Sequence, residues 1–135
     1  GVQTCALPIY RLICTTPFFN PPIKRGDILV FVPNQEEYKN EFWVKRLIGL
    51  PGDHVEIKDG IVYVNGERLA EPYVKKPTNY TGSFVVPKDK YLMLGDNRAD
   101  SLDARFWKNP FIDISAVKYV ANFRVYPFND MGNID

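Results

Sequence analysis

The sequence is poor in the residue types that most often build metal sites and disulfide frameworks. Its 135 residues include two cysteines, Cys5 and Cys14, and one histidine, His54. There is no Cys-x-x-Cys pair and no group of histidines, so neither zinc nor another metal is predicted. A structural disulfide is not expected either. The sequence therefore predicts no metal and no cofactor.

Long apolar runs and an excess of one charge are also missing. No stretch approaches the roughly 20 apolar residues that a membrane-spanning helix requires. The 17 basic and 16 acidic residues are interspersed and give a formal net charge of +1. Such a balance provides no basic surface of the kind that nucleic acids select, so nucleic acid is not an expected partner.

The sequence does contain short β-branched and aromatic runs separated by turn residues. Strands are expected at 28–32, 42–48, 55–64, 84–86, 91–94 and 119–126. Asp59-Gly60 and Asn65-Gly66 are typical of two-residue hairpin turns with positive φ, so 55–69 should form a β-meander. The predicted class is mainly β in one domain, with coiled antiparallel sheets or an open β-barrel.

The stretches between these runs are expected to be irregular. Prolines in 10–24 favour an extended, irregular path. The connections 35–41 and 71–82 should be exposed, and 110–116 should form a turn or a short helix. His54 is expected to be a surface turn residue, which makes a serine–histidine site improbable.

Lys45 lies inside an apolar strand, in the stretch EFWVKRLIGLPGD at 41–53. Removing an ammonium from water is costly and favours the neutral amine, which can accept a proton from a serine hydroxyl. The alternative is a half-exposed strand with the lysine stem packed and the amine in water. Side-chain alternation does not decide between them, because Lys45 and Arg46 give each face one charge.

A second stretch, YLMLGDNRADSLDARFW at 91–107, places many polar groups between apolar flanks. The flanks should hold part of it against the core, where each charge needs a partner. Asp103 and Arg105 are a natural pair, and Ser101 could offer its hydroxyl to a neighbouring amine.

Together with RGDILVF at 25–31, the stretches FWVKRLIGLPGD and GDNRADSLDAR resemble three consecutive signature boxes of bacterial type I signal peptidases. These are membrane-bound serine-lysine proteases that remove signal peptides from exported proteins. The three boxes in order are far more specific than any one of them. The tail FRVYPFNDMG resembles the family's usual end, so the resemblance covers 23–132. Integrin binding through RGD is not expected, because the tripeptide precedes a predicted strand.

The resemblance implies a role for each matching position. Lys45 matches the general base, and Ser101 matches the residue that orients its amine. Asp103 and Arg105 match an ion pair that supports this geometry. The start of the same box is matched by Gly95, Asp96, Asn97 and Arg98. The groove that binds a signal peptide as an added strand is matched by Phe42, Trp43 and Val44.

The resemblance also implies what lies outside these residues. The family's nucleophilic serine precedes the RGD box, in a Ser-Met-x-Pro motif beside a membrane helix, and Ser83, Ser101 and Ser115 have no such context. Residues 1–9, GVQTCALPI, resemble a translated sequencing adapter and are left out of the fold prediction. We therefore expect 10–135 to be a partial catalytic domain without nucleophile or membrane anchor, inactive by itself.

The whole protein, on this interpretation, is anchored in the bacterial cytoplasmic membrane with its catalytic domain on the outer side. Its partners would be the signal peptides of exported preproteins, cleaved after an Ala-x-Ala-like site. Ala99 and Asp100 replace the family's usual Asp and Asn, and Lys108 stands where glycine is common. Local pairing should therefore differ while the function is kept.

Two other classes remain open at this point. One is a soluble, self-cleaving serine-lysine protease of the repressor type, which lacks the GDNRxxSxDxR box and carries a DNA-binding domain. The other is a non-catalytic β module in which Lys45 is only packed. The segment upstream of the RGD box would separate them: a membrane helix with Ser-Met-x-Pro, a helix-turn-helix, or neither.

Overall fold

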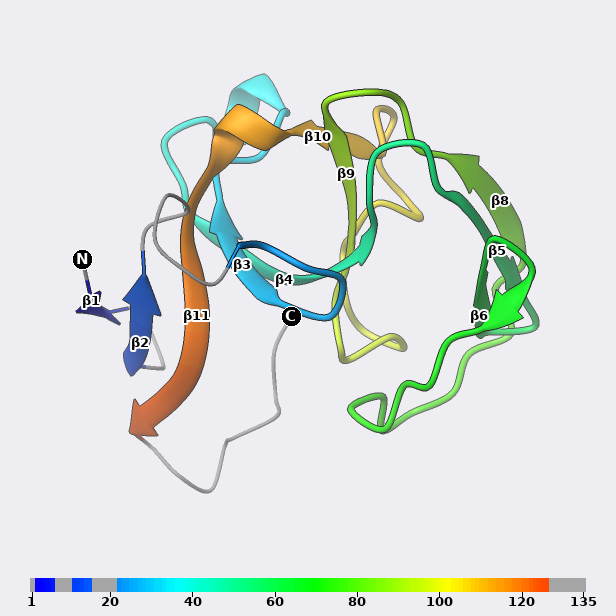
Figure 1. Ribbon diagram of the computed structural model, residues 1–135, viewed down its shortest axis with the longest axis horizontal. Coiled ribbons are helices and arrows are strands. Elements are labelled where there is room, and N and C mark those ends of the chain that lie inside the picture. The colour runs from blue at the N-terminus through cyan, green and yellow to red at the C-terminus, as the bar shows by residue number, and fades with distance from the viewer. Residues whose placement is uncertain (1, 7–10, 16–21, 127–135) are drawn as a thin grey trace.

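A computed structural model describes residues 2–6, 11–15 and 22–126, with side chains from 22 to 121. Two antiparallel sheets form the fold (Figure 1). In the described part of the chain there is no α-helix, only the 3-10 turns η1 (Glu36–Tyr38) and η2 (Ile114–Ala116). The mainly β prediction is confirmed.

The larger sheet has seven strands in the order β1-β2-β11-β3-β4-β9-β10. Their bounds are β1 (Val2–Ala6), β2 (Arg11–Thr15), β11 (Val117–Tyr126), β3 (Ile28–Phe31), β4 (Trp43–Gly49), β9 (Lys90–Leu94) and β10 (Phe111–Asp113). The strands of this sheet come from the two ends and the middle of the chain, so it brings sequence-distant segments together.

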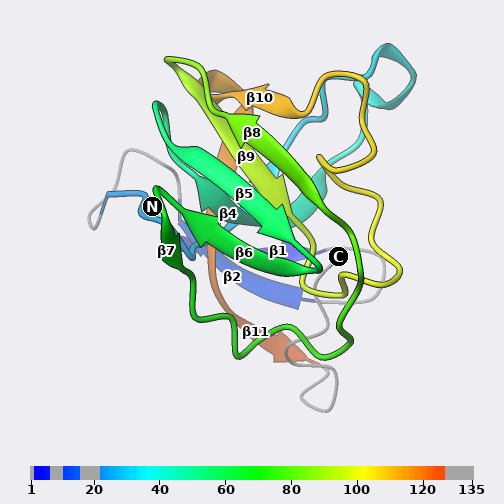
Figure 2. The same cartoon turned by 90° about the vertical axis from the view of Figure 1, so that its right-hand side faces the viewer.

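The smaller sheet has four strands in the order β7-β6-β5-β8. Their bounds are β5 (His54–Lys58), β6 (Ile61–Val64), β7 (Glu67–Arg68) and β8 (Gly82–Val85). Asp59 and Gly60 both have positive φ, as do Asn65 and Gly66, so the two predicted hairpin turns are confirmed. Figure 2 shows this sheet in front of the larger one.

Strand β4 contributes to three hydrophobic clusters. Leu47 packs in one with Leu29 and Met93, Ile48 packs in a second with Val55, and Val44 packs against a third. Gly49 ends β4 where the backbone passes close to its neighbours: a Cβ there would lie 2.8 Å from Val86 Cγ2. A larger residue would force these side chains apart.

Three strands were not expected from the sequence. Strand β2 lies in the segment predicted to be irregular, and it is regular because it pairs with β11. Strand β10, predicted as a turn or short helix, pairs with β9 and leads into η2. Strand β1 falls in the segment left out of the prediction. The structure does not describe the side chains of Cys5 and Cys14. The residues around Pro17 and the tail beyond Tyr126 also lie outside the described residues.

The connection 71–82 was predicted to be exposed, and this is wrong at six partly buried residues: Glu71, Tyr73, Val74, Thr78, Tyr80 and Gly82. Glu71 and Tyr73 are partly buried because they turn towards the larger sheet, while Pro72 and the two lysines that follow are exposed. His54 is exposed as expected, but it begins β5 and is not part of a turn.

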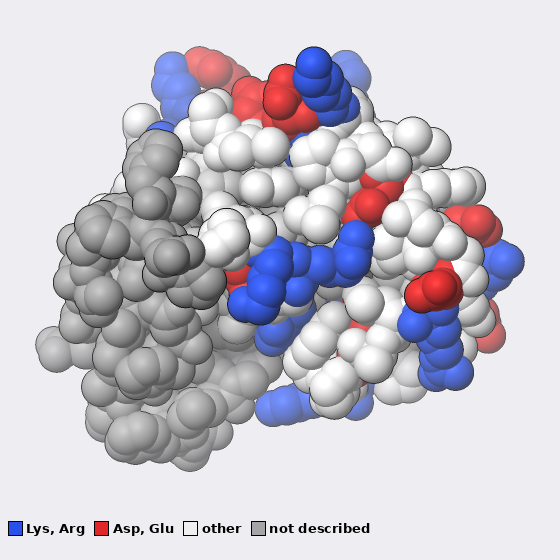
Figure 3. All heavy atoms as spheres, in the orientation of Figure 1, with Lys and Arg blue, Asp and Glu red and all other residues white. Residues whose placement is uncertain are grey.

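The described surface carries both signs of charge. On the face shown in Figure 3, acidic and basic side chains are dispersed among uncharged ones, with a small basic group near the centre. None of the described helices has the length and apolar content needed to cross a bilayer.

Candidate active site

The Lys45 side chain lies in the interior, with only 5% of the residue exposed. Strand β4 holds it: Lys45 is opposite Leu29 of β3, and Arg46 is opposite Leu94 of β9. The Nζ atom donates a hydrogen bond of 3.1 Å to Ser101 Oγ, across 56 residues of sequence. It also lies 5.8 Å from the centroid of the Trp43 ring. The structure therefore brings together the amine and the hydroxyl that the sequence singled out.

Ser101 lies in the segment 95–105, which we call the box loop. The loop has no strand or helix, so polar contacts fix its course. Ser101 is 5% exposed, and its backbone N–H donates to Asn97 O at 2.8 Å. Asp103 Oδ2 accepts the N–H of Gly95 at 3.0 Å, which ties the loop's start to its end.

Asp103 and Arg105 form a buried pair, as the sequence suggested. Arg105 Nε donates to Asp103 Oδ1 at 2.8 Å, and Nη2 donates to Oδ2 at 2.9 Å. Neither side chain is more than 2% exposed. Such a two-bond arrangement fixes the guanidinium plane. Arg105 Nη2 also donates to Arg98 O at 2.8 Å, so the pair holds the middle of the loop as well.

A second, partly buried pair joins the lysine strand to the box loop. Arg46 donates to both carboxylate oxygens of Asp96, at 2.8 and 2.7 Å, and to Gly26 O at 2.8 Å. Burial is the largest single influence and lowers the pKa of Arg46, but the hydrogen bond to Asp96 and the charges of Asp96, Tyr73 and Glu71 together raise the net pKa. Sequence reasoning placed Asp96 in the box but gave it no partner. The sequence did contain a signal for this pair, because Arg46 is a second charge in an apolar strand and such a charge needs a partner.

A third pair joins Arg98 of the box loop to Glu71, a residue outside the three boxes. Arg98, 4% exposed, donates to Glu71 Oε1 and Oε2 at 3.0 and 2.5 Å, and to Gly95 O at 2.7 Å. Tyr73 OH donates to Glu71 Oε2 at 3.0 Å. Glu71 and Tyr73 were missed because they lie in a proline-containing connection with no strand pattern.

The RGD box is attached to the end of the lysine box. Arg25 Nη2 donates to Asp53 Oδ2 at 2.6 Å, and Arg25 Nε donates to Ile48 O at 3.2 Å. Gly26 has φ +96°, so the tripeptide forms a turn, as predicted, and enters β3. The three boxes thus converge on one region through side-chain ion pairs.

The residues expected to contact a substrate lie at the start of β4. Phe42 precedes the strand and is 54% exposed, while Trp43 and Val44 are partly buried. The pairing of β4 with β9 begins only at Arg46, whereas its pairing with β3 already begins at Trp43. On the side that faces β9, the first residues of β4 therefore pair with no strand in the described part of the chain. Their role in binding stays a prediction.

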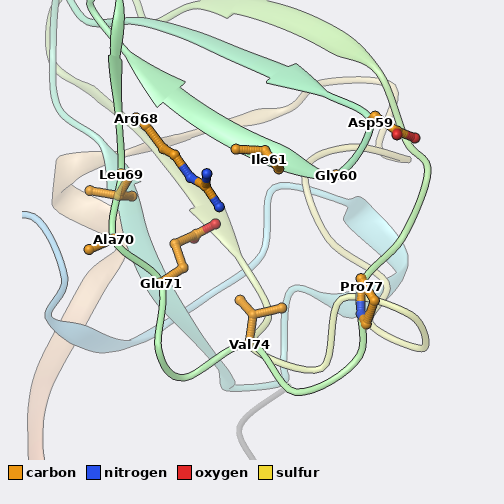
Figure 4. Close-up of a pocket in the computed structure, with 9 residues that line it drawn as sticks. All are labelled: Asp59, Gly60, Ile61, Arg68, Leu69, Ala70, Glu71, Val74 and Pro77. Carbon is orange, nitrogen blue, oxygen red and sulfur yellow. The ribbon is translucent and has the colours of Figure 1, made fainter.

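A pocket of about 520 Å³ lies apart from these groups, between the β5–β6 turn and the residues that follow β6 (Figure 4). Its lining includes none of Lys45, Ser101, Asp103 or Arg105. Arg68 and Glu71 point towards one another in it (Figure 4). Glu71, which holds Arg98 of the box loop, thus also lines this pocket.

A serine–histidine site was predicted to be improbable, but the structure does place a serine beside His54. His54 Nε2 lies 2.9 Å from Ser83 Oγ, because β5 and β8 are neighbours. Glu56 approaches the same nitrogen at 3.9 Å, whereas a catalytic triad places its carboxylate on Nδ1. The exposed contact is therefore not arranged as a triad. No cluster of three possible metal ligands occurs among the residues described.

The positions that depart from the family pattern lie on the surface. Ala99, Asp100 and Lys108 are all exposed. Asp100 Oδ2 lies 4.0 Å from Lys76 Nζ, a solvated contact. Asp100 N also donates to Asn97 O at 3.0 Å, within the box loop. That these departures leave the function intact stays a prediction.

Comparison with known proteins gives this geometry a context. The family described as "Signal peptidase, peptidase S26" matches residues 9–126. A signal peptidase I of Leptolyngbya laminosa is 41% identical over 122 residues, covering 86% of this chain and 59% of that protein. A signal peptidase I of Bacillus licheniformis is 39% identical over 123 residues, covering 83% and 64%. The chain thus spans about three fifths of the length of these relatives.

A solved structure agrees with the sequence relatives. The crystal structure of a signal peptidase I from Enterococcus faecalis V583 matches with a TM-score of 0.62 at 34% identity. The match covers 74% of this chain and 97% of that chain.

Proposed function

Because the chain belongs to the signal peptidase family, peptidase S26, we propose that the complete protein is a serine endopeptidase that cleaves signal peptides from exported preproteins. The observation that carries the proposal is the buried 3.1 Å contact between Lys45 Nζ and Ser101 Oγ. Family membership favours this function over a self-cleaving repressor and over a non-catalytic module.

Lys45 acts as the general base in this proposal. Its neutral amine accepts the proton of a serine hydroxyl while that oxygen bonds to the carbonyl carbon of the scissile peptide. The resulting ammonium donates the proton to the leaving amine as the C–N bond breaks. Water then attacks the acyl-enzyme ester while Lys45 accepts its proton, and that proton passes to the serine oxygen as the ester C–O bond breaks and the acyl product leaves as a carboxylic acid. The attacking serine is supplied, in this proposal, by a segment upstream of the RGD box in the complete protein.

Ser101 and the Asp103–Arg105 pair position that base. Removing an amine from water disfavours its charged form, and Lys45 is 5% exposed. A neutral amine can accept a hydrogen bond as well as donate one, so the Ser101 hydroxyl can restrict its direction. Asp103 and Arg105 hold the loop that carries Ser101 and do not touch the reacting atoms.

The substrate binds as an extended strand along the start of β4. Phe42, Trp43 and Val44 precede the first β4–β9 pair, so their side of the strand can form backbone hydrogen bonds with a peptide. Small residues on both sides of a variable one, the Ala-x-Ala pattern, would fit shallow apolar subsites there. We propose that the catalytic domain lies on the outer side of the cytoplasmic membrane, where exported preproteins emerge.

Replacing Lys45 tests the proposal. In the complete protein, Lys45→Met keeps the length of the side chain but removes the amine, so folding should stay near normal and preprotein cleavage should be abolished. Lys88→Met, at an exposed turn position, is the matched control and should cleave like the wild type. The measurement is the rate of preprotein cleavage in detergent or vesicles. Comparable cleavage by Lys45→Met would refute the assignment of the base.

A further inference from the structure

The box loop depends on a residue that lies outside it. The Arg98 guanidinium is buried and donates one bond to Gly95 O at 2.7 Å, within the loop. Two further bonds from this guanidinium go to Glu71, 27 residues earlier in the chain. A buried guanidinium that loses its carboxylate leaves an uncompensated charge, which is strongly unfavourable. Glu71 therefore holds Arg98, and through it the backbone at Gly95.

Arg98 connects that anchor to the reacting region. Its carbonyl oxygen accepts the bond from Arg105 Nη2, while Arg105 holds Asp103 in two further bonds. Asp103 in turn accepts the Gly95 N–H. Ser101 lies between Arg98 and Asp103 in this closed set of contacts. A shift of Arg98 would therefore move the backbone on both sides of the Ser101 hydroxyl.

Tyr73 fixes the anchor from its other side. Its hydroxyl donates to Glu71 at 3.0 Å, and its ring centroid lies 3.9 Å from Arg46 Cζ. Arg46 is the neighbour of Lys45 on β4 and holds Asp96 of the box loop. Burial, and then the Glu71 carboxylate, raise the pKa of the Tyr73 hydroxyl, which keeps it as a donor to Glu71. The connection after β7 thus contacts both the lysine strand and the loop.

We infer that Glu71 and Tyr73 are positioning residues for the proposed reaction. Through Arg98 and Arg46, they hold the Ser101 hydroxyl in the orientation in which it hydrogen-bonds to the Lys45 amine. This inference rests on the proposed function of Lys45. Neither residue touches the amine or the hydroxyl, so their effect passes through the loop geometry. Displacements of about 1 Å at reacting groups can lower rates by two orders of magnitude.

The direct test compares variants of the complete protein on a signal-peptide substrate. Glu71→Gln removes the charge that holds Arg98, and Tyr73→Phe removes only one hydroxyl. Glu67→Gln, at an exposed position of β7, is the control with the same change of charge. We expect kcat to fall about tenfold in Glu71→Gln and about threefold in Tyr73→Phe, with KM within about twofold. Glu67→Gln should match the wild type.

Two readouts separate positioning from a general loss of folding. The melting temperature and the fraction of enzyme titrated by an active-site acylating inhibitor are measured for each variant, and kcat is expressed per titrated site. Glu71→Asp, which restores the charge on a shorter side chain, should recover part of kcat. An unchanged kcat per titrated site in both Glu71→Gln and Tyr73→Phe would overturn the inference. If Glu71→Gln does not fold, the kcat of Tyr73→Phe decides alone.

The same experiment keeps this inference distinct from the proposed function. Lys45→Met is included in the series. An inactive Lys45→Met beside a wild-type-like Glu71→Gln would overturn only the positioning role. An active Lys45→Met would overturn the general base, and with it the premise of the inference.

Discussion

The Ser101 hydroxyl lies within hydrogen-bond distance of the Lys45 amine and can direct it. It lies 3.1 Å from Nζ, and both residues are 5% exposed. A lysine side chain has many rotamers, so a hydrogen bond that restricts its terminal amine removes a large part of its freedom. Ser101 should therefore affect the rate of the reaction more than the stability of the fold.

Ser101→Ala is expected to lower kcat about a hundredfold in the complete protein, since it leaves the amine in place but undirected. The melting temperature should change by only a few degrees, because one hydroxyl is lost. Ser115→Ala, an exposed serine of η2, is the control and should have no effect. Kinetics and thermal melts of the three proteins check this. A Ser101→Ala enzyme with wild-type kcat would show that the contact does not direct the base.

At this scale the sequence predicted the residues with a family match and missed their partners. Lys45, Ser101, Asp103 and Arg105 lie together as expected. The partners Glu71 and Arg25 come from segments 27 residues before Arg98 and 28 residues before Asp53. Pairing over such distances depends on strand order, which no local pattern contains.

Strand β4 owes its position partly to the polar turn that follows it. Asp53 accepts bonds from Arg25 Nη2, Leu50 N and Asn65 Nδ2 at 2.6, 2.8 and 3.0 Å. Burial alone would raise the pKa of Asp53, but the bonds from Arg25, Leu50 and Asn65 outweigh it and lower the pKa. The carboxylate thus ties the RGD turn, the end of β4 and the β6–β7 turn to one point.

This pKa shift predicts an acid-sensitive part of the stability. Because the folded pKa lies below the unfolded one, Asp53 contributes its full stabilisation above the unfolded value and loses it as the pH falls through the folded value. Asp53→Asn should cost about 1–3 kcal/mol at pH 7 and weaken the decline of stability below pH 4. Denaturant unfolding of the complete protein between pH 7 and pH 3 measures both, with the exposed Glu37→Gln as control. Equal stability and an equal acid decline in Asp53→Asn would contradict this role.

Among the elements, the hairpins were predictable, whereas strands β10 and β2 were not. Asp59-Gly60 and Asn65-Gly66 specify their turns locally through positive φ. Strand β10 has three residues and becomes a strand because β9 lies beside it. Strand β2 likewise depends on β11, which comes about a hundred residues later in the sequence. Such strands are formed by tertiary pairing more than by propensity.

At the scale of the whole molecule, the two sheets bring three short sequence boxes to one place. Strand β4 packs into three hydrophobic clusters, through Ile48, Leu47 and Val44, and these contacts hold the lysine strand in place. The ion pairs Arg25–Asp53, Arg46–Asp96 and Arg98–Glu71 then join the loops around it. The sequence predicted the class and the boxes, whereas the order of the strands and these pairs required the structure.

The most direct test of the central claim restores the amine alone. Lys45→Cys in the complete protein is unfolded, treated with 2-bromoethylamine to give S-aminoethylcysteine, and refolded, with modification at position 45 verified by mass spectrometry. Wild-type protein treated in the same way controls for alkylation of Cys5 and Cys14. The account predicts that Lys45→Cys does not cleave a preprotein and that the alkylated protein does. Cleavage by unmodified Lys45→Cys at the wild-type rate would contradict it, and so would verified alkylation that restores none.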